Sequence, residues 1–356
     1  MKKEAQTSSV PIDKIAEVGY SNMIVQEQMT DSIPKLPNIK TLKNTLSKQR
    51  RKVRPPLPKR LEHLPHTIPI QYTMTKRGDT FLFYDGQLGT KRGLVFASEN
   101  DLSYLIKQKH WYCDGTFYTS PSIFYQIYSI HAYDEGLSSP CVFALLADKL
   151  ETTYQAFFIM LFNTMNKFRS QIQLETVTID FELAVKNTFA KNFPTVQVKD
   201  CLFCYGQALF RKFTNLDFAA IALLPENEFD DAVQALSSNI PDTYENEIHS
   251  LLQYHESTYG KNSNFPPPMY NHYRNFNPRT INHLEGQHHR WKKRSLRPHD
   301  DIYRCIDMIK NEQIIANDQR ERCDASEASP KRKRNNRIAE EALVRLWERY
   351  DMYVKH

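Results

Sequence analysis

The chain has 356 residues, of which 40% are hydrophobic and 12% aromatic, enough for a large packed core and too many for a wholly disordered polypeptide. No run approaches the roughly 18 to 20 apolar residues of a membrane span, and the polar start lacks a signal-peptide core, so we expect a soluble, intracellular protein without a membrane partner. The six cysteines are too scattered for a disulfide framework, and the net charge of +6 is compatible with a polyanionic partner.

Residues 1–60 are expected to form a helical and basic N-terminal segment. Apolar residues recur at helical spacing from Ile39 to Leu46, and the proline-rich stretch that starts at Pro55 ends this pattern. The stretch from Lys40 to Arg60 carries nine Lys and Arg and no acid. This segment is therefore a candidate for contact with nucleic acid, although a basic block can also be a solvated face.

Residues 61–213 are expected to form an α/β core. Apolar runs from Phe81 to Phe96 predict a leading hairpin. Three further strands are predicted over 111–117, 123–133 and 141–146, most simply as an antiparallel meander.

The second half of this core alternates between helix and strand. Apolar residues at spacings of three, four and seven predict a helix from Tyr154 to Phe168, with Thr152 and Gln155 as a capping box. A buried strand, a helix and a short strand follow, at 177–181, 182–193 and 196–198. Three strands, helix, strand, helix, strand is the order of a ribonuclease-H-like fold, a mixed five-stranded sheet flanked by helices.

Residues 214–275 have helical patterns and are expected to form a helical insertion before the last helix of the core. The core is expected to resume in residues 276–322, with helices over 281–291 and 300–315.

Residues 323–356 are expected to be a basic linker followed by an amphipathic helix over 338–353. The tetrapeptide from Lys331 to Arg334 resembles a nuclear-import signal, which predicts a protein of the nucleus. A solvated basic tail is the alternative interpretation of the same residues.

Two acids interrupt otherwise apolar strands. Asp114 and Asp180 both lie in segments that read as buried, where a carboxylate is costly unless it is paired or bound to a metal. The predicted element order makes the two strands neighbours at the centre of the sheet. Glu285, at the start of a helix that also carries His288, is expected to complete the site from beyond the insertion.

Three carboxylates suit a pair of Mg²⁺ or Mn²⁺ ions, because these metals prefer oxygen ligands. Two such ions roughly 3.5 to 4 Å apart activate the attacking oxygen and stabilise the leaving oxygen in phosphodiester displacement. A single Asp near a strand end is more often a turn or cap residue, so the hypothesis depends on the three acids together.

Several short motifs follow one another along the chain. They are Trp111-Tyr-Cys-Asp-Gly-Thr-Phe117, Phe124-Tyr-Gln-Ile-Tyr-Ser-Ile-His131, Ala144-Leu-Leu-Ala-Asp-Lys149 with Glu151-Thr-Thr-Tyr154, Asp180-Phe-Glu182, and Arg279-Thr-Ile-Asn-His-Leu-Glu-Gly-Gln-His288. In this order they resemble the Mutator-like element (MULE) transposase domain of the DDE superfamily, over roughly residues 50 to 315.

The resemblance implies a transposase with Asp114, Asp180 and Glu285 as catalytic and metal-binding acids. Such an enzyme cuts DNA at transposon ends and joins the freed 3′-hydroxyl to target DNA. His288 is an accessory candidate beside these acids.

Cys201 and Cys204 form a Cys-x-x-Cys pair where the family usually has Cys-x-x-His. A second pair at zinc-ribbon spacing is missing, so structural thiols are favoured over a metal site. Gln287 also stands where the family usually has Trp, and the insertion is short between Arg211 and Pro225.

These departures leave an alternative, an inactive or host-recruited transposase-derived DNA-binding protein. A ribonuclease-H-like nuclease that acts on RNA hybrids is a more remote reading of the same acids. No zinc-binding spacing of Cys and His occurs in residues 1–110, so recognition of DNA ends is expected to depend on basic residues.

Two basic clusters are expected to contact DNA through its phosphates, with transposon ends and target DNA as partners and a homo-oligomer left open. The candidate residues are Lys48, Arg50, Arg51, Lys52, Arg54, Arg290, Lys292, Lys293 and Arg294.

Overall fold

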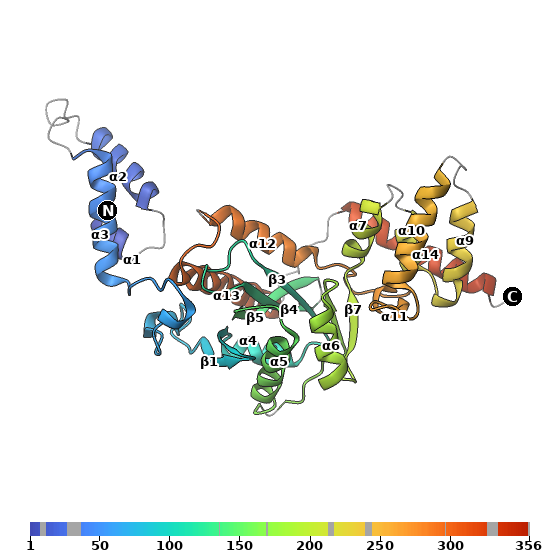
Figure 1. The fold of residues 1–356 in the computed structure, drawn as a ribbon. Coiled ribbons are helices and arrows are strands. Elements are labelled where there is room, and N and C mark those ends of the chain that lie inside the picture. Colours follow the sequence, from blue (N-terminus) through green and yellow to red (C-terminus); the bar gives the residue numbers. More distant parts are fainter. Residues whose placement is uncertain are drawn as a thin grey trace.

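The computed structural model of the chain consists of a central sheet with helical bodies at two ends (Figure 1). It describes residues 1–7, 12–26, 37–134, 136–168, 170–212, 217–238, 244–295, 297–325 and 334–354. Within these ranges, no helix has the length and apolar character to cross a bilayer.

One mixed sheet forms the centre, in the order β1-β2-β5-β4-β3-β6-β7. Its strands are β1 (Leu82–Leu88), β2 (Lys91–Phe96), β3 (His110–Thr116), β4 (Gln126–Asp134), β5 (Leu137–Leu146), β6 (Thr176–Ile179) and β7 (Gln197–Asp200). The meander β3-β4-β5 is antiparallel, as predicted, whereas β6 runs parallel to both β3 and β7.

The sheet has two more strands than predicted. The leading hairpin β1-β2 is not separate from the core, because β2 pairs with the edge of β5 at Leu94–Leu145, Val95–Ala144 and Phe96–Phe143. Leu94, Val95 and Phe96 have no solvent exposure, so this pairing covers an edge that a five-stranded sheet would leave open.

Helices cover one face of the sheet with residues that are near in sequence. This face packs α4 (Glu99–Ile106), α5 (Glu151–Met165) and α6 (Leu183–Asn192) against apolar side chains such as Trp111, Cys113, Val177 and Ile179. The helix α4 was not predicted, although Ser98 and Asp101 form a capping box at its start.

The capping box predicted from Thr152 and Gln155 is wrong. Helix α5 already begins at Glu151, and its N-cap residue makes no side-chain hydrogen bond. Asp148 satisfies this end instead, because its Oδ1 accepts from the Leu150 N–H at 3.2 Å and from the Thr153 hydroxyl at 2.6 Å.

The other face is closed by elements from both ends of the chain. Helices α12 (Asn282–Arg294) and α13 (Ile302–Asp324) pack there with two short 3-10 helices, Leu61–His63 and Ile70–Tyr72. Trp291, Tyr303 and Ile306 are buried at this face. Helix α13 continues nine residues beyond its predicted end at Ile315, because buried Ala316, Asn317 and Arg320 extend its packed side.

The insertion is a helical body with an aromatic core. It contains α8 (Asp217–Ala220), α9 (Phe229–Ser238), α10 (Glu245–Tyr259), α11 (Pro267–Tyr270) and 3-10 turns at Ile221–Leu223 and Glu226–Glu228. Helix α7 (Leu202–Lys212), which lies in the segment expected to belong to the core, packs with them. Tyr205, Phe229, Tyr259 and Tyr270 pack together at its centre. Figure 1 shows this body at the end of the molecule that also carries the C-terminus.

The last helix, α14 (Arg334–Val354), joins the insertion instead of forming a separate tail. Trp347 is 5% exposed, meets Tyr273 and Phe276 edge to face, and donates a hydrogen bond to the Leu223 carbonyl at 2.8 Å. This helix begins at Arg334, four residues before the predicted start, so Arg334 and Arg337 are helical and not part of a linker.

Helices α1 (Lys2–Thr7), α2 (Ile12–Gln26) and α3 (Ile39–Val53) form a small N-terminal bundle at the opposite end (Figure 1). Leu42 and Leu46 are buried against Ala5, Ile15 and Ala16, which confirms the apolar helical face predicted from the sequence.

Candidate active site

Strands β3 and β6 bring Asp114 and Asp180 to one end of the sheet. Asp114 lies in β3, as predicted. Asp180 was predicted within a strand over 177–181, but β6 ends at Ile179, so Asp180 is the first residue after the strand. The two strands are hydrogen-bonded neighbours with Trp111 opposite Val177 and Tyr112 opposite Thr178. Because side chains alternate along a strand, Tyr112 and Asp114 point to the face that α12 covers.

Asp114 is 8% exposed and is only partly paired. Its Oδ1 accepts from the N–H of Gly115 at 2.7 Å, and its Oδ2 lies 3.4 Å from Nδ1 of His288 on α12. The Ser129 hydroxyl of β4 donates to its main-chain carbonyl at 3.3 Å. These contacts hold Asp114 in place, and among the described residues no lysine or arginine forms an ion pair with its carboxylate.

Asp180 and Glu285 are harder to ionise than usual, first because of burial and then because of the Asp114 carboxylate. Burial, the Asp114 carboxylate and Glu182 raise the pKa of Asp180 to about 7. Burial and Asp114 also raise the pKa of Glu285, whereas His288 acts in the opposite direction. Asp114 therefore interacts with both of the other predicted acids, which is the electrostatic pattern of carboxylates that share one site.

A polar network beside Asp180 was not among the predicted site residues. The Glu182 Oε1 accepts from the Tyr154 hydroxyl at 2.8 Å and lies 3.1 Å from the Lys149 ammonium, and Tyr154 in turn accepts from Gln126 at 2.7 Å. Lys149, Tyr154 and Glu182 all occur in the motifs quoted above, which was the available signal. The network places one lysine charge next to the acids.

The three predicted acids have the donor atoms that hard divalent metals prefer, but their side chains are not arranged as a metal site. Asp114, Asp180 and Glu285 supply only oxygen, the atom that Mg²⁺ and Mn²⁺ prefer, and a cation would offset the effect of the Asp114 carboxylate on the other two acids, whose pKa values are raised by burial and by Asp114. Within the described residues, however, no three His, Cys, Asp or Glu side chains are close enough to hold a metal ion.

Cys201 and Cys204 lie at the end of β7 and in the first turn of α7. Cys201 is fully buried against Tyr112, Ile281 and Leu284, and its Sγ accepts from the Ile281 N–H at 3.4 Å. Its hydrogen bond with Cys204 lowers the pKa of Cys201 and raises that of Cys204. These contacts give the pair a packing role between β3, α7 and α12.

Two of the predicted DNA-binding arginines are structural. Arg50 is 9% exposed, and its Nε donates to the Ala5 carbonyl at 2.9 Å, because helix α1 packs over that side of α3. Arg54 lies 3.5 Å from Asp307 and 3.9 Å from Asp301 of the core, with 13% of its side chain exposed. Neither arginine presents a free cation to DNA.

The remaining basic candidates lie on the surface. Lys48, Arg51 and Lys52 are exposed on α3, and Arg290, Lys292, Lys293 and Arg294 are exposed on α12. Glu312 partly neutralises the second group, since it lies 2.7 Å from Arg294 and 3.8 Å from Arg290. Of the predicted import signal, Lys331, Arg332 and Lys333 lie outside the described residues.

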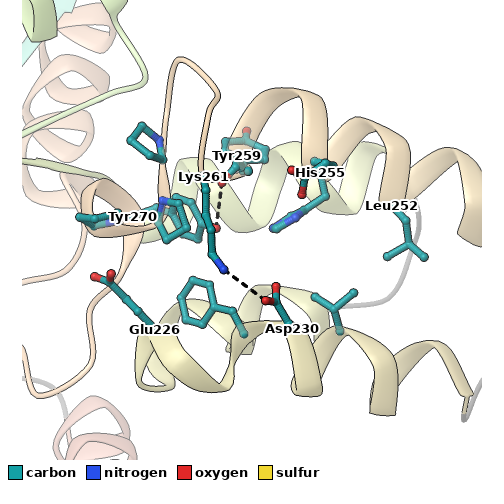
Figure 2. A pocket seen from close by; sticks show the side chains of 14 residues that line it. Glu226, Asp230, Leu252, His255, Tyr259, Lys261 and Tyr270 are labelled. Carbon is teal, nitrogen blue, oxygen red and sulfur yellow. Dashed lines mark hydrogen bonds and ion pairs between the residues drawn. The ribbon is translucent and has the colours of Figure 1, made fainter.

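The insertion contains a cavity of about 730 Å³ with a different character. Figure 2 shows Tyr259 and Tyr270 on its wall and Lys261 directed toward Asp230, at 3.3 Å. Its other charged residues, Glu226 and Glu256, are acidic. An acidic, aromatic wall repels a DNA backbone, so this cavity is no part of the candidate active site.

Comparison with known protein families matches residues 110–206, about a quarter of the chain, to the MULE transposase domain. The match contains Asp114, Asp180, Lys149, Glu182 and both cysteines of the pair, and it confirms the resemblance over this segment. No curated protein matches the chain. The family gives the segment a transposase-related function, with DNA as its general partner.

Proposed function

We propose that this chain is a DDE transposase of the Mutator-like type, which cleaves DNA and transfers a strand with the help of divalent metal ions. One observation carries the proposal most directly. Within a segment that matches a transposase domain, Asp114 lies in β3 and Asp180 directly after the neighbouring strand β6, and burial together with Asp114 raises the pKa values of Asp180 and Glu285.

We infer that the strands β5-β4-β3-β6-β7 are a ribonuclease-H-like core to which β1 and β2 are added. Three antiparallel strands followed by two parallel ones support this view. The placement of Glu285 on α12, after a helical insertion, agrees with the same architecture.

Asp114, Asp180 and Glu285 would hold Mg²⁺ or Mn²⁺, which when bound activates the attacking oxygen and stabilises the leaving oxygen. His288 would keep the Asp114 carboxylate oriented, because its Nδ1 lies 3.4 Å from Oδ2. Lys149 would hold Glu182 and offset part of the negative charge near Asp180. Exposed lysines and arginines of α3 and α12 would contact phosphates.

A cleavage and strand-transfer assay on oligonucleotides with Mg²⁺ or Mn²⁺ tests this function. Asp114→Asn should abolish both reactions and leave DNA affinity in EDTA nearly unchanged. The control is Asp231→Asn, an exposed acid of α9 in the insertion, which should leave both reactions unchanged. Wild-type protein without metal-dependent cleavage would favour the alternative of an inactive DNA-binding derivative.

A nuclear location is a separate part of the proposal, supported by the basic stretch from Lys331 to Arg334. A reporter fused to residues 325–340 should enter the nucleus, whereas the same segment with Ala at the four basic positions should stay outside. Equal distribution of the two reporters would refute this part and leave the enzymatic proposal untouched.

A further inference from the structure

Three large aromatic rings remain exposed on the loop that follows β3. Phe117, Tyr118 and Tyr125 are 39%, 36% and 52% exposed. Phe124, in the same loop, is only 4% exposed, so the loop buries one aromatic ring and leaves three at the surface. Because Phe117 is only three residues beyond Asp114, the exposed rings stand next to the candidate active site.

The loop is held in place by main-chain hydrogen bonds. The Tyr125 N–H donates to Leu146 at 2.8 Å, and the Ser120 N–H donates to Phe117 at 3.2 Å. The N–H of His299, from the segment between α12 and α13, donates to the Tyr118 carbonyl at 2.9 Å. The three rings are thus carried by a backbone fastened to β5 and to the segment after α12.

Two lysines lie over these rings. The Lys149 Nζ is 4.9 Å from the Phe117 centroid, and the Lys292 Nζ is 4.8 Å from the Tyr118 centroid. Phe117 and Tyr125 meet edge to face, with centroids 5.3 Å apart. The surface therefore combines flat apolar rings with ammonium groups, one of them from α12, which carries Glu285.

Rings with flanking cations suit nucleotides whose bases are unpaired. A base stacks on an aromatic face whatever its identity, while lysines pair with the neighbouring phosphates. An intact duplex hides the faces of its bases and offers only phosphates to such a surface. The exposed rings therefore suit a DNA strand that is no longer paired in a duplex.

We propose that Phe117, Tyr118 and Tyr125, with Lys292, form a stacking platform for unpaired nucleotides beside the cleaved phosphate, while Lys149 packs on the Phe117 ring and stays paired with Glu182. This inference rests on the proposed function and makes it more specific, since the substrate bound at the site is locally single-stranded DNA. We call these four residues, the three rings and Lys292, the aromatic platform.

Binding in EDTA separates the aromatic platform from catalysis. Fluorescence anisotropy would compare wild type with Phe117→Ala/Tyr125→Ala, on a labelled oligothymidine and on a duplex of equal length. The double variant should bind the oligothymidine about tenfold more weakly and the duplex less than twofold more weakly. Tyr353→Ala, which removes a ring that is 83% exposed at the end of α14, is the matched control and should change neither affinity.

Two further variants keep the test decisive if the double variant folds poorly. Tyr125→Trp retains a stacking surface and should bind the oligothymidine at least as well as wild type. Lys292→Gln should lower the salt dependence of single-strand binding by about one counterion.

Unchanged affinity for the oligothymidine, or an equal loss on both DNAs, would overturn the platform. Failure of the proposed function has a different signature, because it appears as absent metal-dependent cleavage by a wild type that still prefers the single strand.

Discussion

The polar groups around Asp114 and Asp180, at one end of the sheet, differ from the polar groups buried in the helical insertion. We call the first region the acidic end of the sheet. In the insertion, His255 is buried and neutral, with its pKa lowered to about 4, and its Nε2 meets the Tyr205 hydroxyl at 2.8 Å. The Tyr270 hydroxyl likewise donates to the Tyr259 carbonyl at 3.1 Å. At the acidic end of the sheet, burial and the Asp114 carboxylate raise the pKa values of Asp180 and Glu285.

The difference distinguishes a structural polar core from a functional one. A buried group with a hydrogen-bond partner contributes to stability and to a single packing arrangement. Carboxylates held close together lower the stability of the fold. Such groups occur at functional sites, where a bound ligand offsets their repulsion. We therefore expect substitutions at the acidic end of the sheet to alter catalysis, and substitutions in the insertion to alter stability.

Asp180→Asn should have the largest effect, which is the loss of catalysis at the acidic end of the sheet. Loss of this carboxylate should lower the cleavage rate by about a hundred- to a thousandfold, the usual effect of removing one electrostatic group from an active site. Single-turnover cleavage with Mn²⁺ measures it.

The same variant should not lose stability in EDTA. Asp180 has a folded-state pKa of about 7, above its ordinary 3.8, so its favourable contribution is complete below about pH 4 and disappears as pH rises through 7. At pH 8, Asp180→Asn should melt at the wild-type temperature or above it. Adding Mn²⁺ should then raise the melting temperature of the wild type alone, and a loss of stability independent of metal would count against the catalytic role.

Trp347→Ala should mark the insertion as a structural body that depends on α14. The substitution removes a buried ring and its hydrogen bond to Leu223, at a cost of about 3 kcal/mol. Denaturant melts followed by hydrogen exchange should show the loss in α9, α10 and α14, with protection of β3 and β4 retained. Uniform loss across the sheet would mean that the two regions are one cooperative unit.

His255→Gln should remove a pH dependence that belongs to the insertion. His255 ionises at about pH 4 when folded and near 6.5 when unfolded, so its contribution is complete above 6.5 and is lost as pH falls toward 4. Wild type should lose about 2 kcal/mol through this histidine over that range. The variant should lose correspondingly less in urea melts at pH 7 and pH 4.5, and parallel losses in both proteins would contradict the assignment.

Arg51→Gln and Arg50→Gln should show the smallest effects, and opposite ones. Arg51 is exposed, so its loss should weaken duplex binding about two- to threefold and lower the salt slope by about one. Arg50 is buried, so its loss should cost about 1 kcal/mol of stability in the N-terminal bundle and leave the salt slope unchanged. Identical salt slopes in the two variants would refute this distinction.

The central acids could be predicted from the sequence because their positions follow from element order. The order of three strands, helix, strand, helix and strand predicts a ribonuclease-H-like arrangement, in which the predicted strands of Asp114 and Asp180 are neighbours, and β3 does pair with β6. Arg50 could not be assigned in the same way. Its burial depends on Ala5, from a helix that comes much earlier in the chain, and basic residues on α3 look alike in sequence.

The contacts of Lys149 with Glu182 and with the Phe117 ring were also beyond sequence reasoning. They join side chains from three separate turns at one end of the sheet. Helix α14 was predicted as a helix, but its packing partner was not, because an amphipathic pattern shows that a face is covered without showing by what.

The packing of Trp347 on the insertion has a consequence for the order in which the chain can fold during synthesis. One face of the sheet is closed by α4, α5 and α6, all complete by Asn192, so this half of the core can assemble while the rest is still being translated. The Leu223 carbonyl accepts a hydrogen bond from the indole of Trp347, which is synthesised 124 residues later. A ribosome moving at about 5 to 20 residues per second therefore leaves the insertion incomplete for several seconds after the β-sheet has emerged.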